Sequence, residues 1–206
     1  MRPEHVLEKL AARLLPSAPP LPPVDCLVPD WAPERPFERP PVPAAVLIGL
    51  VERPEGLTVL YTERSPDLRS HSGQVAFPGG KVDPTDAGVA AAALREAREE
   101  VGMRTEDATI LGYMSPYFTG TYYLITPVVA AISPRGPFVP NPGEVHSVFE
   151  VPLLRLLDAA NYNQLTARRG GKEMSTWQID HEGHRIWGIT ANLTLRLRDL
   201  LMGDET

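Results

Sequence analysis

The sequence contains a single cysteine, Cys26, which excludes an intramolecular disulfide framework. No apolar run approaches the roughly 18 residues that a membrane-spanning helix requires, and the start MRPEHVLEKLAARLLPS lacks the apolar stretch of a secretory signal. Basic residues are also scarce, since 20 Lys and Arg stand against 26 Asp and Glu and leave a net charge of -6. This balance argues against bulk binding to nucleic acid or to an anionic membrane. We therefore expect a cytoplasmic protein with a dedicated site for any anionic small molecule.

Proline is abundant in one part of the chain only. Of 23 prolines, 12 lie within residues 1–43, where they remove backbone donors and fix φ. We predict a Pro-rich N-terminal segment over residues 1–43 with one short helix near His5 to Leu15. Residues 44–206 are predicted to form a single folded domain, because a chain of 206 residues with 43% hydrophobic content can bury one substantial core.

Strand and helix patterns follow one another irregularly after residue 43. A hairpin is predicted from strands at Ala44–Glu52 and Leu57–Ser65, joined by the turn RPEG. Further strands are predicted near residues 108–118, 123–132, 144–151 and 175–189, and helices near residues 86–101, 152–160 and 190–203. This irregular mixture favours an α+β layered fold over strict strand–helix alternation.

Three glutamates crowd one helix in the stretch ALREAREEVG. At 100° per residue, Glu96, Glu99 and Glu100 fall within an arc of roughly 100°, and Glu100 borders an apolar stripe. The stripe consists of Ala90, Ala93, Leu94, Ala97 and Val101. Gly102 is predicted to end this helix in the left-handed conformation.

Two interpretations of these glutamates stay open on the residues alone. One is a solvated acidic face, neutralised by Arg95 and Arg98. The other is a site for a hard divalent cation such as Mg²⁺ or Mn²⁺, which prefers oxygen ligands and relieves the repulsion among clustered carboxylates.

The string GGKVDPTDAGVAAAALREAREEVGM resembles the Nudix box, whose pattern is G-x5-E-x7-R-E-U-x-E-E-x-G-U with U aliphatic. The match in residue type is complete from Arg95 to Met103. Two departures precede it, since Asp86 stands where the pattern has Glu, and eight rather than seven residues separate Asp86 from Arg95. The preceding string RSPDLRSHSGQVAFPGG resembles the signature of the coenzyme A pyrophosphatase subfamily, for which a box of this length is expected.

The resemblance covers about Ala44 to Leu201 and implies a Nudix fold, in which a mixed β-sheet is sandwiched between helices. It also implies hydrolysis of coenzyme A or its derivatives to 3',5'-ADP and 4'-phosphopantetheine, with Mg²⁺ or Mn²⁺. The implied metal ligands are Glu96, Glu100, Glu99 and the Gly80 carbonyl. Arg95 would orient this cluster, and Glu99 or Glu144 would be the general base.

Residues beside the box have open roles. For Asp86 we favour an ordinary N-cap of the helix, and Asp83 is ambiguous. Arg64, Arg69 and His71 are candidates for binding the substrate, because the 3'-phosphate of coenzyme A requires cationic partners. Each of these three could instead be a solvated loop residue.

Two other classes of function compete with coenzyme A hydrolysis. The first keeps the chemistry but acts on another nucleoside diphosphate derivative, such as ADP-ribose, a dinucleoside polyphosphate or a damaged nucleoside triphosphate. The second is a non-catalytic nucleotide-binding module, which would not need three crowded glutamates. The sequence leaves the oligomeric state open, a homodimer included.

Overall fold

A mixed β-sheet forms the centre of the molecule in the computed structural model, which describes residues 2–20, 40–68, 70–169 and 172–203. Its five-strand path runs β3-β2-β1-β7-β5, and β4, β6 and β8 pair with β1, β7 and β2. The bounds of these strands are β1 Val42–Arg53, β2 Gly56–Arg64, β3 Val75–Ala76, β4 Gly79–Lys81, β5 Ala108–Tyr113, β6 Tyr117–Phe118, β7 Tyr123–Ile132 and β8 Val145–Pro152.

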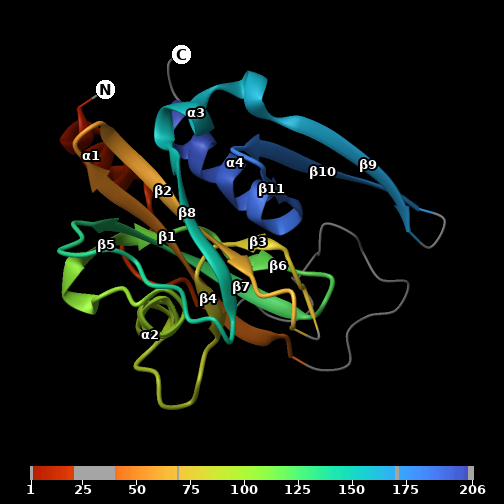
Figure 1. The fold of residues 1–206 in the computed structure, drawn as a ribbon, viewed down its shortest axis with the longest axis horizontal. Coiled ribbons are helices and arrows are strands. Elements are labelled where there is room, and N and C mark those ends of the chain that lie inside the picture. The colour runs from red at the N-terminus through yellow and green to blue at the C-terminus, as the bar shows by residue number, and fades with distance from the viewer. Residues whose placement is uncertain (1, 21–39, 69, 170–171, 204–206) are drawn as a thin grey trace.

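Helices cover both faces of this sheet (Figure 1). The α-helices of the described residues are α1 Pro3–Arg13, α2 Val89–Val101, α3 Leu153–Leu157 and α4 Gly188–Met202. One hydrophobic core joins one face of the sheet to α1, α3 and α4. A second core joins the opposite face to α2 through Ala93 and Ala97. The predicted α+β fold, with a mixed sheet between helices, is confirmed.

The central strand β1 is buried on both faces because its sequence is almost continuously apolar. It pairs in parallel with β7 along ten residues, from Val42 opposite Tyr123 to Val51 opposite Ile132. It also forms the predicted hairpin with β2 and, through Ala44–Val46, pairs with β4. The short strand β4 is thereby fixed beside the centre of the molecule.

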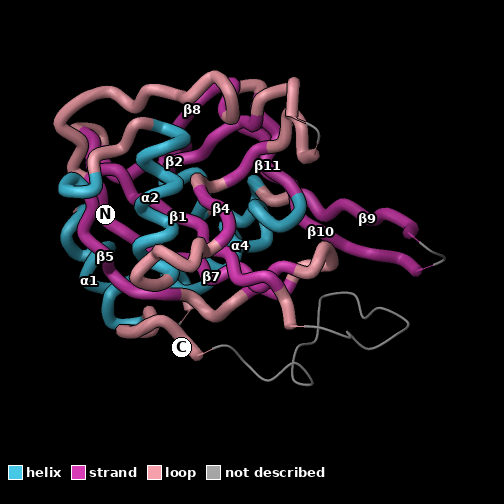
Figure 2. Tube along the Cα trace, turned by 90° about the horizontal axis from the view of Figure 1, so that it is seen from below, coloured by secondary structure: helices cyan, strands magenta, loops and turns pink. Residues whose placement is uncertain are grey.

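A three-stranded sheet lies beside the main body, in the order β11-β10-β9. Its strands are β9 Asn163–Arg169, β10 Lys172–His181 and β11 His184–Trp187. The pair β10 and β11 fits the predicted strand pair, whereas β9 was not predicted. The hairpin of β9 and β10 extends away from the body (Figures 1 and 2).

The predicted N-terminal helix is present, but it lies two residues earlier than predicted, at Pro3–Arg13, and it packs into the core of the domain. Val6, Leu10 and Leu14 are buried in the same core as α3 and α4. Backbone hydrogen bonds of 2.9 Å join Leu15 and Tyr113 in both directions. Residues 3–15 therefore belong to the folded body, although the domain boundary between residues 43 and 44 remains a prediction. Cys26 lies outside the described residues.

The predicted start of the box helix is wrong by three residues. The helix begins at Val89 after Gly88, whose φ of 138° suits glycine, and it has no side-chain cap. Asp86 is therefore not the N-cap, because its carboxylate accepts hydrogen bonds from Arg95. The predicted end is confirmed, since Gly102 has a φ of 64° and donates its N–H to the Arg98 carbonyl.

Within the parts of the chain that the structure describes, none of the helices combines the length and the apolar character needed to cross a membrane.

We predict that Leu10→Ala lowers the free energy of unfolding by about 2–5 kcal/mol, because Leu10 is fully buried between α1 and the rest of the core. Leu154→Ala is the matched control, since that leucine on α3 is 64% exposed and should lose no more than about 0.5 kcal/mol. Urea denaturation measures both. Equal losses would show that α1 does not contribute to the stability of the domain.

Candidate functional site

The carboxylates of Glu96 and Glu100, on α2, lie against the glycine pair Gly79 and Gly80 of β4. A Cβ atom added to Gly80 would lie 2.4 Å from Oε1 of Glu96, so no larger residue fits there unless Glu96 moves. The backbone N–H of Gly79 donates to Oε2 of Glu100 at 3.3 Å. The two glycines of the box therefore set how closely β4 approaches the two glutamates.

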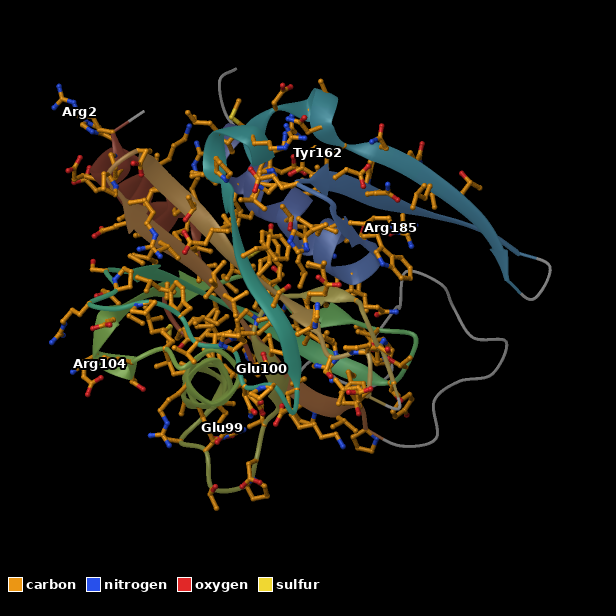
Figure 3. All side chains as sticks on the ribbon, in the orientation of Figure 1. Arg2, Glu99, Glu100, Arg104, Tyr162 and Arg185 are labelled. Carbon is orange, nitrogen blue, oxygen red and sulfur yellow. The ribbon has the colours of Figure 1, made fainter. Side chains whose placement is uncertain are left out.

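The three box glutamates differ sharply in exposure. The side chain of Glu100 is 4% exposed, that of Glu96 is 15% exposed and that of Glu99 is 46% exposed. Figure 3 shows Glu100 on the side of α2 that faces the sheet and Glu99 on the outer side. The helix thus carries one carboxylate into the edge of the core and leaves another in solvent.

Burial makes both inner carboxylates hold their protons more tightly than in water. Burial is the largest cause that raises the pKa of Glu100 to about 8, opposed by the Gly79 N–H and the charge of Arg64. Burial also raises the pKa of Glu96, against the opposing effect of Arg95. Repulsion from Glu144 contributes to both increases. A bound cation would favour the ionised form of both glutamates.

Arg95 ties the outer part of the cluster together. Its Nε and Nη2 donate to the two carboxylate oxygens of Asp86, each at 3.0 Å. Its Nη1 donates to Glu96 at 2.9 Å and to Glu99 at 3.1 Å, and Nη2 also donates to the Lys81 carbonyl at 3.2 Å. These bonds raise the pKa of Arg95, with Asp86 as the largest cause. This geometry is consistent with the orienting role expected of Arg95.

Asp83 shapes the turn that precedes the helix. Its carboxylate accepts hydrogen bonds from the Thr85 N–H at 2.9 Å and from the Thr85 hydroxyl at 2.7 Å. Its own N–H donates to Asp86 at 2.8 Å. The ambiguity over Asp83 and Asp86 is thus resolved in favour of a turn that presents Asp86 to Arg95.

Glu144 is brought near the cluster by the loop between β7 and β8. The Asn141 N–H donates to the Glu100 carbonyl at 2.8 Å, and the Asn141 carbonyl accepts from the Glu144 N–H at 3.0 Å. The Glu144 carbonyl in turn accepts from the Ser65 N–H at 2.9 Å. The sequence pattern gave no indication of Asn141, since its contribution comes mainly from the backbone.

The three predicted substrate-binding residues are not equivalent. Arg64, at the end of β2, lies with Nη1 at 3.9 Å from Oε1 of Glu100. His71 is exposed on the loop between β2 and β3, has a φ of 58° and bonds to Gln74 at 2.9 Å. Arg69 lies outside the described residues. The structure therefore brings Arg64, but not His71, into contact with the glutamate cluster.

The carboxylate oxygens of the box glutamates suit a hard divalent cation, but in the structure they do not converge on one common position. Among the described side chains, no three of Asp, Glu, His or Cys converge closely enough to hold a metal ion as they stand. Glu96 and Glu100 supply carboxylate oxygens. A bound cation would lower their raised pKa values by favouring the ionised carboxylates. A third carboxylate from Glu99 would have to leave Arg95 and turn inwards.

Comparison with known proteins identifies the family of the domain that carries this cluster. A family model described as NUDIX domain matches residues 40–177. Proteins named uncharacterized Nudix hydrolase NudL, from Salmonella paratyphi B and Salmonella newport, are 44% identical over 160 residues, which is 77% of this chain and 81% of each relative.

Solved structures with a similar fold include two of bacterial origin. The Nudix hydrolase RenU of M. smegmatis has a TM-score of 0.53 at 21% identity, over 79% of this chain and 86% of its own. DR0079 from Deinococcus radiodurans has a TM-score of 0.50 at 18% identity, over 76% of this chain and 82% of its own. At these identities the likeness concerns the fold.

We predict that Glu100→Gln stabilises the protein in the presence of a chelator, and that this gain grows with pH. Folding raises the pKa of Glu100 from 4.5 to about 8. Below about pH 4.5 both states bind the proton and the variant differs little. As pH rises towards 8 the unfolded chain releases the proton of Glu100 while the folded chain retains it, so the stability of the wild type falls. The Glu100→Gln variant has no proton to release at this position and does not show this loss.

Thermal unfolding in EDTA at about pH 5, 7 and 9 tests this expectation. Glu106→Gln is the control, because that carboxylate is 67% exposed. A difference in Tm between Glu100→Gln and wild type that stays constant with pH would contradict it.

Proposed function

Because the chain belongs to the Nudix hydrolase family, we propose that it hydrolyses the diphosphate of coenzyme A or its derivatives, giving 3',5'-ADP and 4'-phosphopantetheine. The observation that supports diphosphate chemistry is the contact of Glu96 and Glu100 with the glycine pair of β4. The observation that supports coenzyme A is the segment RSPDLRSHSGQVAFPGG, which runs from Arg64 to that glycine pair.

We propose Mg²⁺ or Mn²⁺ as the cofactor, held by Glu96 and Glu100, with Glu99 and the Gly80 carbonyl as further ligands. When bound by these residues, such an ion would supply charge neutralisation at the phosphate oxygens and would lower the pKa of a bound water. Arg95 holds Glu96 in place from the outer side of α2. This division of roles keeps Arg95 away from the substrate, because its donors already have acceptors.

Two carboxylates are available to take the proton of the attacking water. Glu144 lies in the loop attached to Glu100 through Asn141, and its charge acts on both Glu96 and Glu100. Glu99 is exposed and bonded to Arg95. We propose Glu144 or Glu99 as the general base, since both side chains are exposed to solvent beside the cluster.

Recognition of coenzyme A is proposed to come from the loop between β2 and β3. Arg64 ends β2 just before this loop, His71 lies in the loop, and Arg69 lies between them in the sequence. A nucleotide bound at the cluster would place a phosphate beside Arg64, which already lies 3.9 Å from Glu100. The 3'-phosphate distinguishes coenzyme A from dephospho-coenzyme A, which is identical at the diphosphate, so recognition of this group would favour coenzyme A as the substrate.

We predict that Glu96→Gln lowers kcat by on the order of 10² to 10³, because one charge of a preorganised site at the reacting phosphate is lost. Activity should depend on Mg²⁺ or Mn²⁺, vanish in EDTA and return with excess metal. Glu106→Gln, which alters an exposed carboxylate, serves as the control. Full turnover by a folded Glu96→Gln would remove this residue from the site.

We also predict that the enzyme prefers coenzyme A to dephospho-coenzyme A by about ten- to a hundredfold in kcat/KM, because a charge-assisted bond to the 3'-phosphate is lost. Higher salt should reduce the preference. Arg69→Ala should reduce it while sparing the dephospho substrate, and Arg104→Ala, at a 57% exposed arginine, should not.

Product analysis with coenzyme A, ADP-ribose and NADH in parallel completes the test. Equal rates on coenzyme A and its dephospho form would argue against recognition of the 3'-phosphate. Faster hydrolysis of ADP-ribose would move the assignment to another nucleoside diphosphate derivative, and hydrolysis of none would favour a binding module.

A further inference from the structure

We infer that Arg64 contacts the oxygens of the diphosphate that is cleaved, and that it does not read the 3'-phosphate. This inference rests on the proposed diphosphate chemistry but not on coenzyme A as the substrate, because every competing substrate shares the diphosphate. It separates Arg64 from Arg69 and His71, with which the sequence groups it.

The backbone holds Arg64 firmly at the end of β2. Its N–H donates to the Gln74 carbonyl at 3.0 Å, and its carbonyl accepts from the Gly73 N–H at 3.2 Å. On the other side, the pairing of β2 with β8 shifts register between Glu63 and Arg64. A register shift of this kind redirects the side chain that follows it. The backbone of Arg64, from which the guanidinium extends, is thus held by the loop before β3 on one side and by β8 on the other.

The guanidinium of Arg64 retains unused donors beside the cluster. Its Nη1 lies 3.9 Å from Oε1 of Glu100, which is an ion pair but too long for a hydrogen bond. Its Nε is buried, and among the described residues no acceptor bonds to it. A buried N–H without an acceptor is costly in a folded protein. A phosphate oxygen arriving at the cluster would supply the missing acceptor.

Arg95 is committed to other acceptors in the structure. Even if Glu99 turned towards a metal ion, the Nε and Nη2 of Arg95 would stay bonded to Asp86 and its Nη1 to Glu96. All three of its nitrogens already donate, to Asp86, Glu96, Glu99 and the Lys81 carbonyl. Arg64 and Arg95 are the arginines that form ion pairs with the box glutamates in the described part of the chain. Only Arg64 of these two has donors left, and a planar guanidinium can bind two phosphate oxygens at once.

The test compares Arg64→Ala and Arg64→Lys on coenzyme A and dephospho-coenzyme A. A group that stabilises charge at the reacting phosphate should lower kcat by about a hundredfold on both substrates, with their ratio unchanged. Lysine should restore part of the loss. Guanidinium chloride added to the Arg64→Ala enzyme should rescue kcat, an effect that a purely structural role would not produce. Arg104→Ala is the exposed control.

Three results would overturn the inference. These are a loss confined to coenzyme A, an unchanged kcat in Arg64→Ala, and a loss in folded Arg64→Ala that guanidinium cannot rescue. Thermal unfolding verifies that each variant is folded.

The same variants can be tested even if the proposed substrate is wrong. An enzyme that cleaves ADP-ribose but not coenzyme A would refute the substrate, and the series would then be run on ADP-ribose. Calorimetric binding of inorganic pyrophosphate with Mg²⁺ gives a measurement that needs no turnover. Arg64→Ala should weaken that binding by roughly tenfold, and unchanged binding would count against the contact.

Discussion

The contact between α2 and the glycine pair of β4 is the constraint on which the site depends. Glu96 touches the position where Gly80 has no Cβ, and Glu100 accepts from the Gly79 N–H. The strand stays in place because it pairs with β1, the buried central strand of the sheet. The helix stays in place because its alanines pack on the sheet beside those glutamates. Core packing therefore sets the distance between the carboxylates and the strand.

The burial of Glu100 lowers the stability of the folded protein where this carboxylate is ionised. Burying Glu100 at the edge of a hydrophobic core, with Glu96 and Glu144 nearby, disfavours its ionised form. A protein without need of a charged ligand would gain by replacing such a residue. The retained glutamates, and the partly unsatisfied Arg64 beside them, are groups whose costs a bound cation and a bound phosphate would offset.

Two loops outside the box attach the proposed site residues Glu144 and Arg64 to the scaffold. The loop after β7 hydrogen-bonds through Asn141 to the Glu100 carbonyl and carries Glu144. The loop after β2 leaves from Arg64 and returns through β3 towards the glycine pair. The Ser65 N–H bonds to the Glu144 carbonyl and joins the two loops. A displacement of either loop would therefore change the positions of the groups around the glutamate cluster.

The sequence by itself determined the order of most elements, the layered α+β fold and the membership of the glutamate cluster. These features depend on local periodicity and on residue spacing along one helix. The tertiary structure decided what spacing cannot show: Asp86 receives Arg95 instead of capping α2, Asn141 carries Glu144 to the cluster, and α1 belongs to the core. It also showed that Arg64 lies beside Glu100 and that His71 does not. That difference depends on strand pairing and burial, which involve residues distant in the chain.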